Sequence, residues 1–202
     1  MARLHTNLYE PYEASSLVNP VVFVVDMVNG FCKEGALHDK AILDIVDAQK
    51  RLMDTLECRN VFVCDNHPPK TREFESFPAH CVIGTSEAEV IEELLPYVKR
   101  HIAKNSINTF HAEGFKEFLK EDMHRYNDIV IVGCCTDLCI LQFVLTLQSY
   151  LNEHNMTDYK IIVPANGVET YHIDGVHDAY MWNHVALENM KAVGVTVVSE
   201  IK

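Results

Sequence analysis

The chain has 202 residues, of which 48% are hydrophobic and 23% charged, a balance typical of a globular domain with a sizeable core. Its formal net charge of -12 argues against nucleic acid or an anionic membrane as a partner, because both bind basic surfaces. No apolar run is long enough for a membrane span and the N-terminal stretch lacks a signal-peptide core, so we expect a cytoplasmic protein.

Short apolar runs rich in β-branched residues alternate with amphipathic stretches along the chain. The expected strands are residues 21–26, 60–65, 100–103, 128–133, 159–163 and 194–198. The expected helices lie near residues 40–57, 85–98, 113–125, 136–153 and 178–192. Because the strand runs are apolar throughout, they are typical of strands covered on both faces. The pattern predicts an α/β fold: a single domain over residues 1–202, with a parallel sheet of about five or six strands and helices on both faces.

Polar residues follow several of these apolar runs directly. Asp26, Asp65 and the cluster from Cys134 to Cys139 stand at strand ends, and Lys104 follows the weaker run at 100–103. Parallel sheets place their sites at the carboxyl ends of the strands, so these positions are predicted to meet at one edge. Asp26 is well placed there as a general base. Taken singly, however, an Asp can cap a turn and most lysines are solvated.

The stretch "CDNHPPKTREFESFPAHC", residues 64–81, combines metal-ligand residue types with a Pro-bearing loop. Asp65 and His67 are two positions apart at a strand end, and His80 follows a loop that can fold back. One carboxylate and two imidazoles suit a divalent transition metal with open coordination positions. Glu73 could add a fourth ligand. The alternative is a polar surface loop with scattered histidines.

The chain has 7 cysteines, an odd number, and no C-x-x-C pair, which favours reduced thiols over a disulfide framework or a zinc ribbon. Three of them lie in "IVGCCTDLCI", residues 131–140. Cys139 is expected in the first turns of a helix, where amide groups and the helix dipole lower a thiol pKa. Cys134 is expected to be buried filler, and Cys135 to contribute its backbone N–H at the turn.

Four motifs together resemble the isochorismatase-like cysteine hydrolases, and within them the nicotinamidase/pyrazinamidase group, over nearly the whole chain. "VVDMVNGF" contains Asp26 where the family has its first-strand Asp, and "AKNSINTF" contains Lys104 at the position of the family's lysine. "GCCTDLCI" matches the pattern G-x-x-T-D-x-C-V, with Cys139 at the nucleophile position. "DNHPP" and "FPAHCVIGTSEAEV" resemble the metal loop of nicotinamidases.

The chain departs from the family pattern beside these motifs. Met27 and Val28 replace a usual polar pair, and Gly30 replaces a common Asp. Phe77 stands where many members have Trp, and Glu73 occupies a place comparable to an extra His. These changes leave the hydrolase assignment in place and bear on the shape of the substrate pocket.

The resemblance implies hydrolysis of nicotinamide to nicotinate and ammonia, in NAD salvage, through a thioester on Cys139. Asp26 would accept and return the proton, and Lys104 would stabilise the thiolate. The backbone N–H groups of Cys135 and Cys139 would form the oxyanion hole. The resemblance also implies a cis peptide bond between Cys134 and Cys135.

The resemblance further implies one divalent metal ion, zinc, with iron or manganese as alternatives. Its ligands are expected among four side chains: Asp65, His67, His80 and Glu73. The ion would bind the pyridine nitrogen and so direct the carboxamide to the nucleophile. Phe31 and Phe77 are candidates to flank the pyridine ring.

Two other functions stay open on the sequence. The chain could be another amide or carbamoyl hydrolase of the same superfamily, or a catalytically silent ligand-binding member. The expected partner is a small-molecule amide, and the oligomeric state, including a homo-oligomer, is left open. Residues 164–187 contain His172, His177 and His184, which are expected to be surface or packing residues and not ligands.

Overall fold

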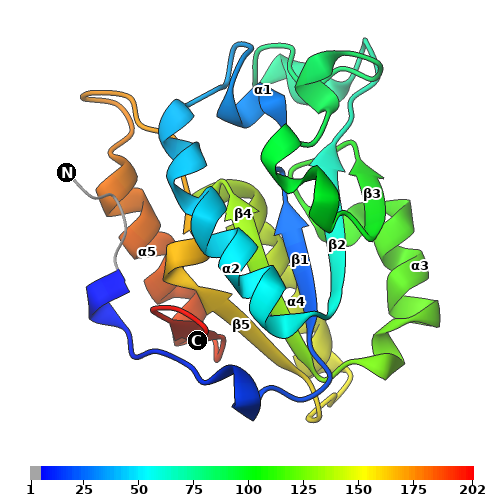
Figure 1. Ribbon diagram of the computed structural model, residues 1–202. Helices are drawn as coiled ribbons and strands as arrows, with labels where there is room; N and C mark the ends of the chain where they lie inside the picture. Colours follow the sequence, from blue (N-terminus) through cyan, green and yellow to red (C-terminus); the bar gives the residue numbers. More distant parts are fainter. Residues whose placement is uncertain (1–5) are drawn as a thin grey trace.

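A parallel β-sheet lies at the centre of the computed structural model, which describes residues 6–202 (Figure 1). Its strands are β1 (Val21–Val25), β2 (Arg59–Asp65), β3 (Arg100–Lys104), β4 (Asp128–Cys134), β5 (Lys160–Pro164), β6 (Val168–Glu169) and β7 (Thr196–Val198). The order along the sheet is β3-β2-β1-β4-β5-β7, β6 pairs with β4, and these pairs are all parallel. The predicted α/β fold with a parallel sheet is therefore confirmed.

The sheet has seven strands, which corrects the prediction of five or six. The additional strand, β6, contains two residues, Val168 and Glu169, which pair with Gly133 and Cys134. A strand this short leaves no apolar run in the sequence. It is defined by its hydrogen bonds to β4, which local pattern does not report.

Helices cover both faces of the sheet, as predicted (Figure 1). The α-helices are α1 (Asn29–Cys32), α2 (Val46–Leu56), α3 (Glu113–Glu121), α4 (Leu141–Glu153) and α5 (Ala179–Ala192). Helix α2 packs on one face, and α3, α4 and α5 pack on the other. On the second face Phe23 of β1 meets Phe115, Phe118 and Phe143 edge-on, with ring centroids 5.1 to 5.6 Å apart. Burying each such ring contributes about 1.5–3 kcal/mol, so this cluster anchors β1 to its helices.

Residues 85–98 do not form the predicted helix. They form two short 3₁₀ helices, η5 (Ser86–Ala88) and η6 (Glu92–Tyr97). Pro96 lies inside η6 and has no N–H to donate to a helical hydrogen bond. Between the two turns, Val90 forms an isolated antiparallel bridge with the loop after β1. The apolar residues of this segment, whose spacing indicated a helix, therefore pack an irregular segment over the sheet edge.

Two other predicted helices begin with a tighter or wider turn. The segment at 40–57 is a 3₁₀ helix, η3 (Lys40–Ile45), followed by α2. The segment at 136–153 is a π-helical turn, η9 (Thr136–Ile140), followed by α4. A π-turn is frequent at functional sites, and this one contains Cys139.

The carboxyl ends of β1 to β4 lie together at the upper edge of the sheet in Figure 1. Asp65 at the end of β2 is in register with Lys104 at the end of β3. Val25 at the end of β1 is in register with Val63 of β2 and Gly133 of β4. The residues that follow these strands therefore gather at one edge.

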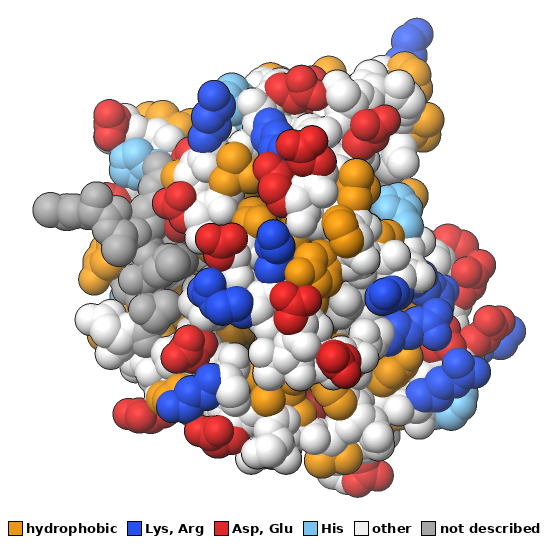
Figure 2. Space-filling view, in the orientation of Figure 1, with side chains coloured by type: hydrophobic (Ala, Val, Ile, Leu, Met, Phe, Trp, Pro, Cys, Tyr) orange, Lys and Arg blue, Asp and Glu red, His pale blue; other side chains and the backbone are white. Residues whose placement is uncertain are grey.

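Acidic and basic side chains are interspersed on the face seen in Figure 2. Over the whole chain 29 acidic residues outnumber 17 basic ones. Within residues 6–202, none of the helices combines the length and apolarity required to span a bilayer.

Candidate active site and metal centre

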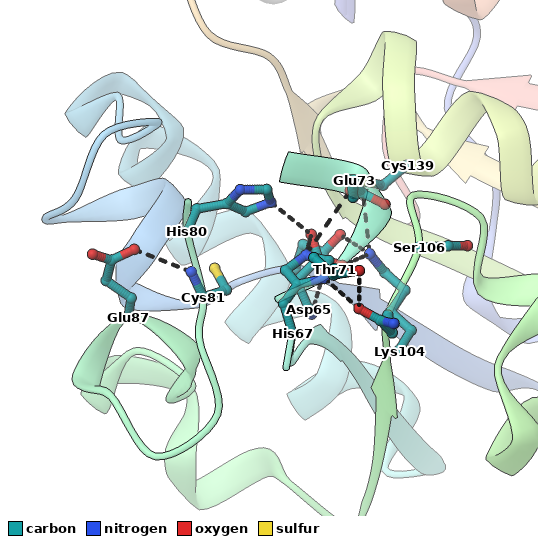
Figure 3. A network of polar contacts seen from close by, with 12 residues as sticks. Asp65, His67, Thr71, Glu73, His80, Cys81, Glu87, Lys104, Ser106 and Cys139 are labelled. Carbon is teal, nitrogen blue, oxygen red and sulfur yellow. Dashed lines mark hydrogen bonds and ion pairs between the residues drawn. The ribbon is translucent and has the colours of Figure 1, made fainter. Parts of the chain in front are cut away.

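Lys104 stands at the centre of the polar cluster at this sheet edge (Figure 3). Its Nζ lies 2.8 Å from Asp26 Oδ2 and 3.8 Å from Cys139 Sγ, and it also contacts Asp65 Oδ1. All four residues are buried. The structure thus brings together the three residues that the sequence suggested for catalysis.

Asp26 is held by the backbone of the neighbouring strand. Its N–H donates to the Val63 carbonyl oxygen at 2.8 Å, and its Oδ1 accepts from the Asp65 N–H at 2.8 Å. Its φ of 55° lies in the left-handed region, which Asp tolerates better than most residues. This conformation ends β1 and directs the carboxylate toward Lys104.

Cys139 lies in the π-turn η9, directly after β4. The carbonyl oxygen of Cys135 accepts hydrogen bonds from the N–H groups of Leu138 and Ile140. The peptide bond between Cys134 and Cys135 is cis, as the resemblance implied. Cys134 is fully buried and its thiol donates to the Asp26 carbonyl oxygen at 3.1 Å, in line with a packing role.

The interior position of Cys139 decides its acidity. Burial raises the pKa of the Cys139 thiol well above its ordinary value, and the Lys104 ammonium only partly opposes this. The predicted lowering of this pKa by a helix terminus is therefore wrong, because the thiolate loses its hydration in the core.

The two partners of the thiol are charged in the neutral range. Burial, with the Asp65 carboxylate beside it, raises the pKa of Asp26 to about 6. Although burial lowers it, the carboxylates of Asp26 and Asp65 raise the pKa of Lys104 well above its ordinary value. A neutral Cys139 thiol beside an ionised Asp26 is suited to general-base catalysis.

Next to Lys104, the four predicted metal ligands converge: Asp65, His67, Glu73 and His80. The Nε2 atom of His67 lies 3.5 Å from Asp65 Oδ2 and 3.9 Å from Glu73 Oε1. The Nε2 atom of His80 lies 3.7 Å from Asp65 Oδ2. One oxygen or nitrogen from each of the four side chains lies within 4.8 Å of the others.

Both histidines direct Nε2 into this cluster because their Nδ1 atoms face acceptors. His67 Nδ1 is 2.8 Å from Asn105 Oδ1, and His80 Nδ1 is 2.8 Å from the Pro78 carbonyl oxygen. Among residues 6–202, the buried Nε2 of His67 has no hydrogen-bond partner. An orphaned imidazole nitrogen among carboxylate oxygens fits a divalent ion of the zinc type, and acceptors behind the rings are typical of metal-ligating histidines.

Sequence reasoning did not identify Asn105. Its amide oxygen also accepts a hydrogen bond from the Thr71 hydroxyl at 3.0 Å, which ties the loop after β2 to the end of β3. Its place directly after Lys104 was the one available signal, and an Asn after a strand is too common to be singled out.

Two adjoining cavities lead from the solvent toward Cys139. A small inner cavity of about 30 Å³ is lined by Cys139, Asp65 and His80, with Phe31 and Phe77 among its walls. An outer cavity of about 540 Å³ shares several walls with it, including both phenylalanines. The two rings lie near His80, at centroid distances of 5.5 Å for Phe31 and 6.3 Å for Phe77. Both side chains thus line the cavity that contains Cys139, and their flanking of a pyridine ring stays a prediction.

The histidines of residues 164–187 have three different environments. His172 lines the outer cavity, His177 is buried and packed, and His184 is exposed. Among the described residues, none of the three belongs to a cluster of metal-ligand type.

Comparison with known proteins places these features in a family. A family model described as the isochorismatase domain matches residues 20–200. Nicotinamidase 1 of Arabidopsis thaliana is 29% identical over 209 residues, which cover 88% of this chain and 84% of that protein.

Solved structures show the same fold. The pyrazinamidase of Pyrococcus horikoshii in complex with zinc has a TM-score of 0.69 at 22% identity, covering 90% of this chain and 99% of that one. PnC1 from L. infantum in complex with nicotinate has a TM-score of 0.72 at 18% identity, covering 90% and 94%.

Proposed function

The chain belongs to the isochorismatase domain family, and from this premise we propose that it is a metal-dependent nicotinamidase. It hydrolyses the carboxamide of nicotinamide to nicotinate and ammonia and so serves NAD salvage. The observation that carries the proposal is the position of Asp65, which contacts Lys104 through one oxygen and faces the metal-loop histidines through the other. A metal centre is thereby joined to a thiol site, and the relatives named for nicotinamide and pyrazinamide chemistry support this pairing.

Acylation begins at the thiol. Asp26 takes the Cys139 proton as the sulfur attacks the carboxamide carbon, and the Lys104 ammonium stabilises the negative charge that develops on sulfur. The carbonyl oxygen becomes an oxyanion, which the backbone N–H groups of Cys135 and Cys139 bind. Each such donor is worth about 3 kcal/mol. Protonated Asp26 then passes its proton to the leaving nitrogen, the C–N bond of the tetrahedral intermediate breaks, and ammonia departs to leave a Cys139 thioester.

Deacylation uses the same proton carrier, with water as the nucleophile and the Cys139 sulfur as the leaving group. Asp26 takes a proton from water, whose oxygen attacks the thioester carbon, and returns that proton to the Cys139 sulfur as nicotinate forms. Lys104 stays charged throughout, because two carboxylates face it. Covalent catalysis suits a primary amide, since it divides the slow attack of water into two easier steps.

Asp65, His67, Glu73 and His80 hold the metal ion. When bound, the ion supplies a Lewis-acid contact for the pyridine nitrogen, which orients the ring. Phe31 and Phe77 flank the ring from the cavity walls. We also propose that residues 1–202 form one hydrolase domain and that the protein is cytoplasmic.

The test compares ammonia release from nicotinamide and benzamide before and after chelation, with zinc, iron or manganese added back. Benzamide has the same amide and ring size but lacks the ring nitrogen. Chelation should therefore reduce nicotinamide hydrolysis by at least about 100-fold and change the slow hydrolysis of benzamide much less.

A panel of ureido, carbamoyl and acyl amides in the same assay separates the other candidates. Faster turnover of one of these than of nicotinamide would assign the protein to another amidase of the superfamily. No turnover of any amide by metal-loaded protein would indicate a silent ligand-binding member. Equal proportional losses for nicotinamide and benzamide on chelation would contradict a positioning role for the ring nitrogen.

A further inference from the structure

The segment between β6 and α5 forms part of the outer cavity wall. Tyr171, His172 and Ile173 all line this cavity. Two walls of the same cavity, Cys135 and Leu138, also line the inner cavity around Cys139. The outer cavity at Tyr171 therefore adjoins the inner cavity that Cys139 lines.

A second outer cavity also adjoins the inner one, from the side of the metal loop. It shares Glu73, Phe77 and Ile107 with the inner cavity. The cavity at Tyr171 shares five residues with the inner one: Phe31, Leu37, Phe77, Cys135 and Leu138. Since Cys135 directly precedes the turn that contains Cys139 and Leu138 lies in that turn next to Cys139, the route past Tyr171 is the more direct.

Tyr171 is held in this wall by a stack of flat side chains. Its ring lies parallel to that of His177, with centroids 3.9 Å apart and an interplanar angle of 14°. His177 is in turn parallel to Trp182 of α5, at 5.4 Å and 7°. The Nδ1 atom of His177 also lies 2.9 Å from the Tyr171 carbonyl oxygen, so His177 restrains both backbone and ring.

The same histidine is tied to the turn that contains the nucleophile. His177 Nε2 lies 2.8 Å from Asp137 Oδ2, and the Thr170 hydroxyl donates to Asp137 Oδ1 at 2.5 Å. Asp137 belongs to η9, two residues before Cys139. One carboxylate thus joins the wall segment to the π-turn, and the side chains of His177 and Asp137 are only 9% and 6% exposed.

We propose that Tyr171 is a specificity-determining residue that limits what reaches Cys139, and that His177 and Asp137 are positioning residues that hold it in place. Selection of nicotinamide over larger amides by this wall rests on the proposed function. The steric limit itself applies to any electrophile that reaches the Cys139 sulfur. Tyr171 stacks on His177, which is itself stacked on Trp182, so the wall rejects bulky groups because Tyr171 cannot move aside without breaking its stack.

The first experiment measures access to Cys139 without using amidase activity. Intact protein of measured metal content is treated with iodoacetamide or with the larger N-phenylmaleimide, and modification of Cys139 is followed by peptide mass spectrometry. Tyr171→Ala and His177→Ala should raise the rate ratio of the large to the small reagent about tenfold. Tyr171→Phe keeps the flat ring and should leave the ratio within about twofold of wild type.

The chain provides a matched control. The ring of His154 lies 4.2 Å from that of Tyr150 at an interplanar angle of 35°, and its Nδ1 lies 2.8 Å from the Tyr150 carbonyl oxygen, at the exposed end of α4. His154→Ala removes a comparable His–Tyr ring contact and hydrogen bond from a position away from the cavities, so the ratio should stay at the wild-type value. If Ile107→Ala raises the ratio and Tyr171→Ala does not, reagents enter through the other cavity and the proposal is wrong.

The second experiment separates a wall from a general structural role. Tyr171→Ala should raise the KM for nicotinamide about threefold to tenfold and change kcat less than about twofold, because the wall does not touch the reacting atoms. An equal loss in kcat, or an unchanged alkylation ratio in correctly folded Tyr171→Ala, would overturn the assignment. Absence of nicotinamide hydrolysis by the wild type would count against the proposed function alone, since the alkylation ratio does not depend on it.

Discussion

Asp65 joins two groups of side chains through its two carboxylate oxygens. Oδ1 contacts Lys104, and Oδ2 faces the Nε2 atoms of His67 and His80. Although burial opposes it, the positive charge of Lys104 holds the pKa of Asp65 well below its usual range. The carboxylate therefore stays ionised in the core, where an unpaired charge would be costly. At the scale of residues, the site is a chain of alternating charges and not a set of independent ligands.

Cys139 provides the most direct residue-scale prediction. Cys139→Ala should lower nicotinamide turnover by at least about 10⁴-fold, because it removes the nucleophile of both half-reactions. The free energy of unfolding should fall only by the small amount expected for removing one buried sulfur atom. Turnover is measured by ammonia release, and folding by circular dichroism and urea unfolding.

The neighbouring thiols are the controls for this substitution. Cys134→Ala and Cys135→Ala should mainly perturb packing, since Cys135 is expected to act through its backbone N–H. If Cys139→Ala stayed active and Cys135→Ala folded but were inactive, Cys135 would be the nucleophile.

Asp26 predicts how activity depends on pH. Its carboxylate must be ionised to take the thiol proton, and burial raises its pKa to about 6. The sign follows: kcat/KM should be high above this pH and fall about tenfold per unit below it. The measurement is kcat/KM for nicotinamide across the acid range, with bound metal determined at each pH to exclude loss of the ion. An acid limb centred near 4, the ordinary Asp value of about 3.9, would show that Asp26 is not the base or is less buried in solution.

At the scale of elements, the contact between β1 and β4 positions both the base and the nucleophile. Asp26 follows β1 and Cys139 follows β4, and Gly133 is in register with Val25 across the pair. A Cβ on Gly133 would lie 2.0 Å from the Val25 carbonyl oxygen. The close approach of these two strand ends therefore depends on a glycine.

Gly133→Ala should destabilise the protein by more than about 3 kcal/mol, because backbone strain and a clash with β1 add together. Gly194→Ala is the matched control, since Gly194 also has a positive φ, +98° against +126° for Gly133, but a Cβ there meets nothing within 4 Å. It should cost only the strain of about 1 kcal/mol. Urea unfolding of the two variants measures this difference, and equal losses would show that the β1–β4 contact relaxes without cost.

At the scale of the whole molecule, the proposed metal site lies between a strand end and a folded-back loop. Asp65 ends β2, whereas Glu73 belongs to the 3₁₀ helix η4 (Arg72–Glu75) and His80 follows it. An ion bound by all of them closes this loop against the sheet. Because the unfolded chain lacks the assembled site, binding should stabilise the folded state.

Zinc at a free concentration of 100 times its Kd should therefore add about 2.7 kcal/mol of stability, or about 5–10 °C in Tm for a chain of this size. His67→Ala and His80→Ala should lose most of this gain, whereas His154→Ala should retain it. Thermal unfolding with and without zinc measures the effect. A zinc-induced rise that persisted in both metal-loop variants would place the ion elsewhere.

The sequence alone determined the strands and the residues that follow them. Each strand except the two-residue β6 leaves its own apolar run, and the rule that parallel strands share a carboxyl edge then brings Asp26, Asp65, Lys104 and Cys139 together. The candidate metal ligands in the loop at 64–81 could also be recognised from the sequence, because Asp65, His67 and His80 are close in the chain. The roles of these residues in catalysis and metal binding stay predictions.

Only the tertiary structure decided quantities that depend on neighbours from several elements. The raised pKa of Cys139 results from burial and from the carboxylates of Asp26 and Asp65 at the ends of two other strands, which no local motif reports. The irregular path of residues 85–98 and the two-residue strand β6 depend on hydrogen bonds to distant segments. The contacts of Asp137 with Thr170 and His177, beside the Tyr171 stack, join residues 33 and 40 positions apart. The sequence pattern indicates which residues each segment buries, whereas tertiary packing decides which side chains meet. The pKa and the accessibility of Cys139 depend on that packing.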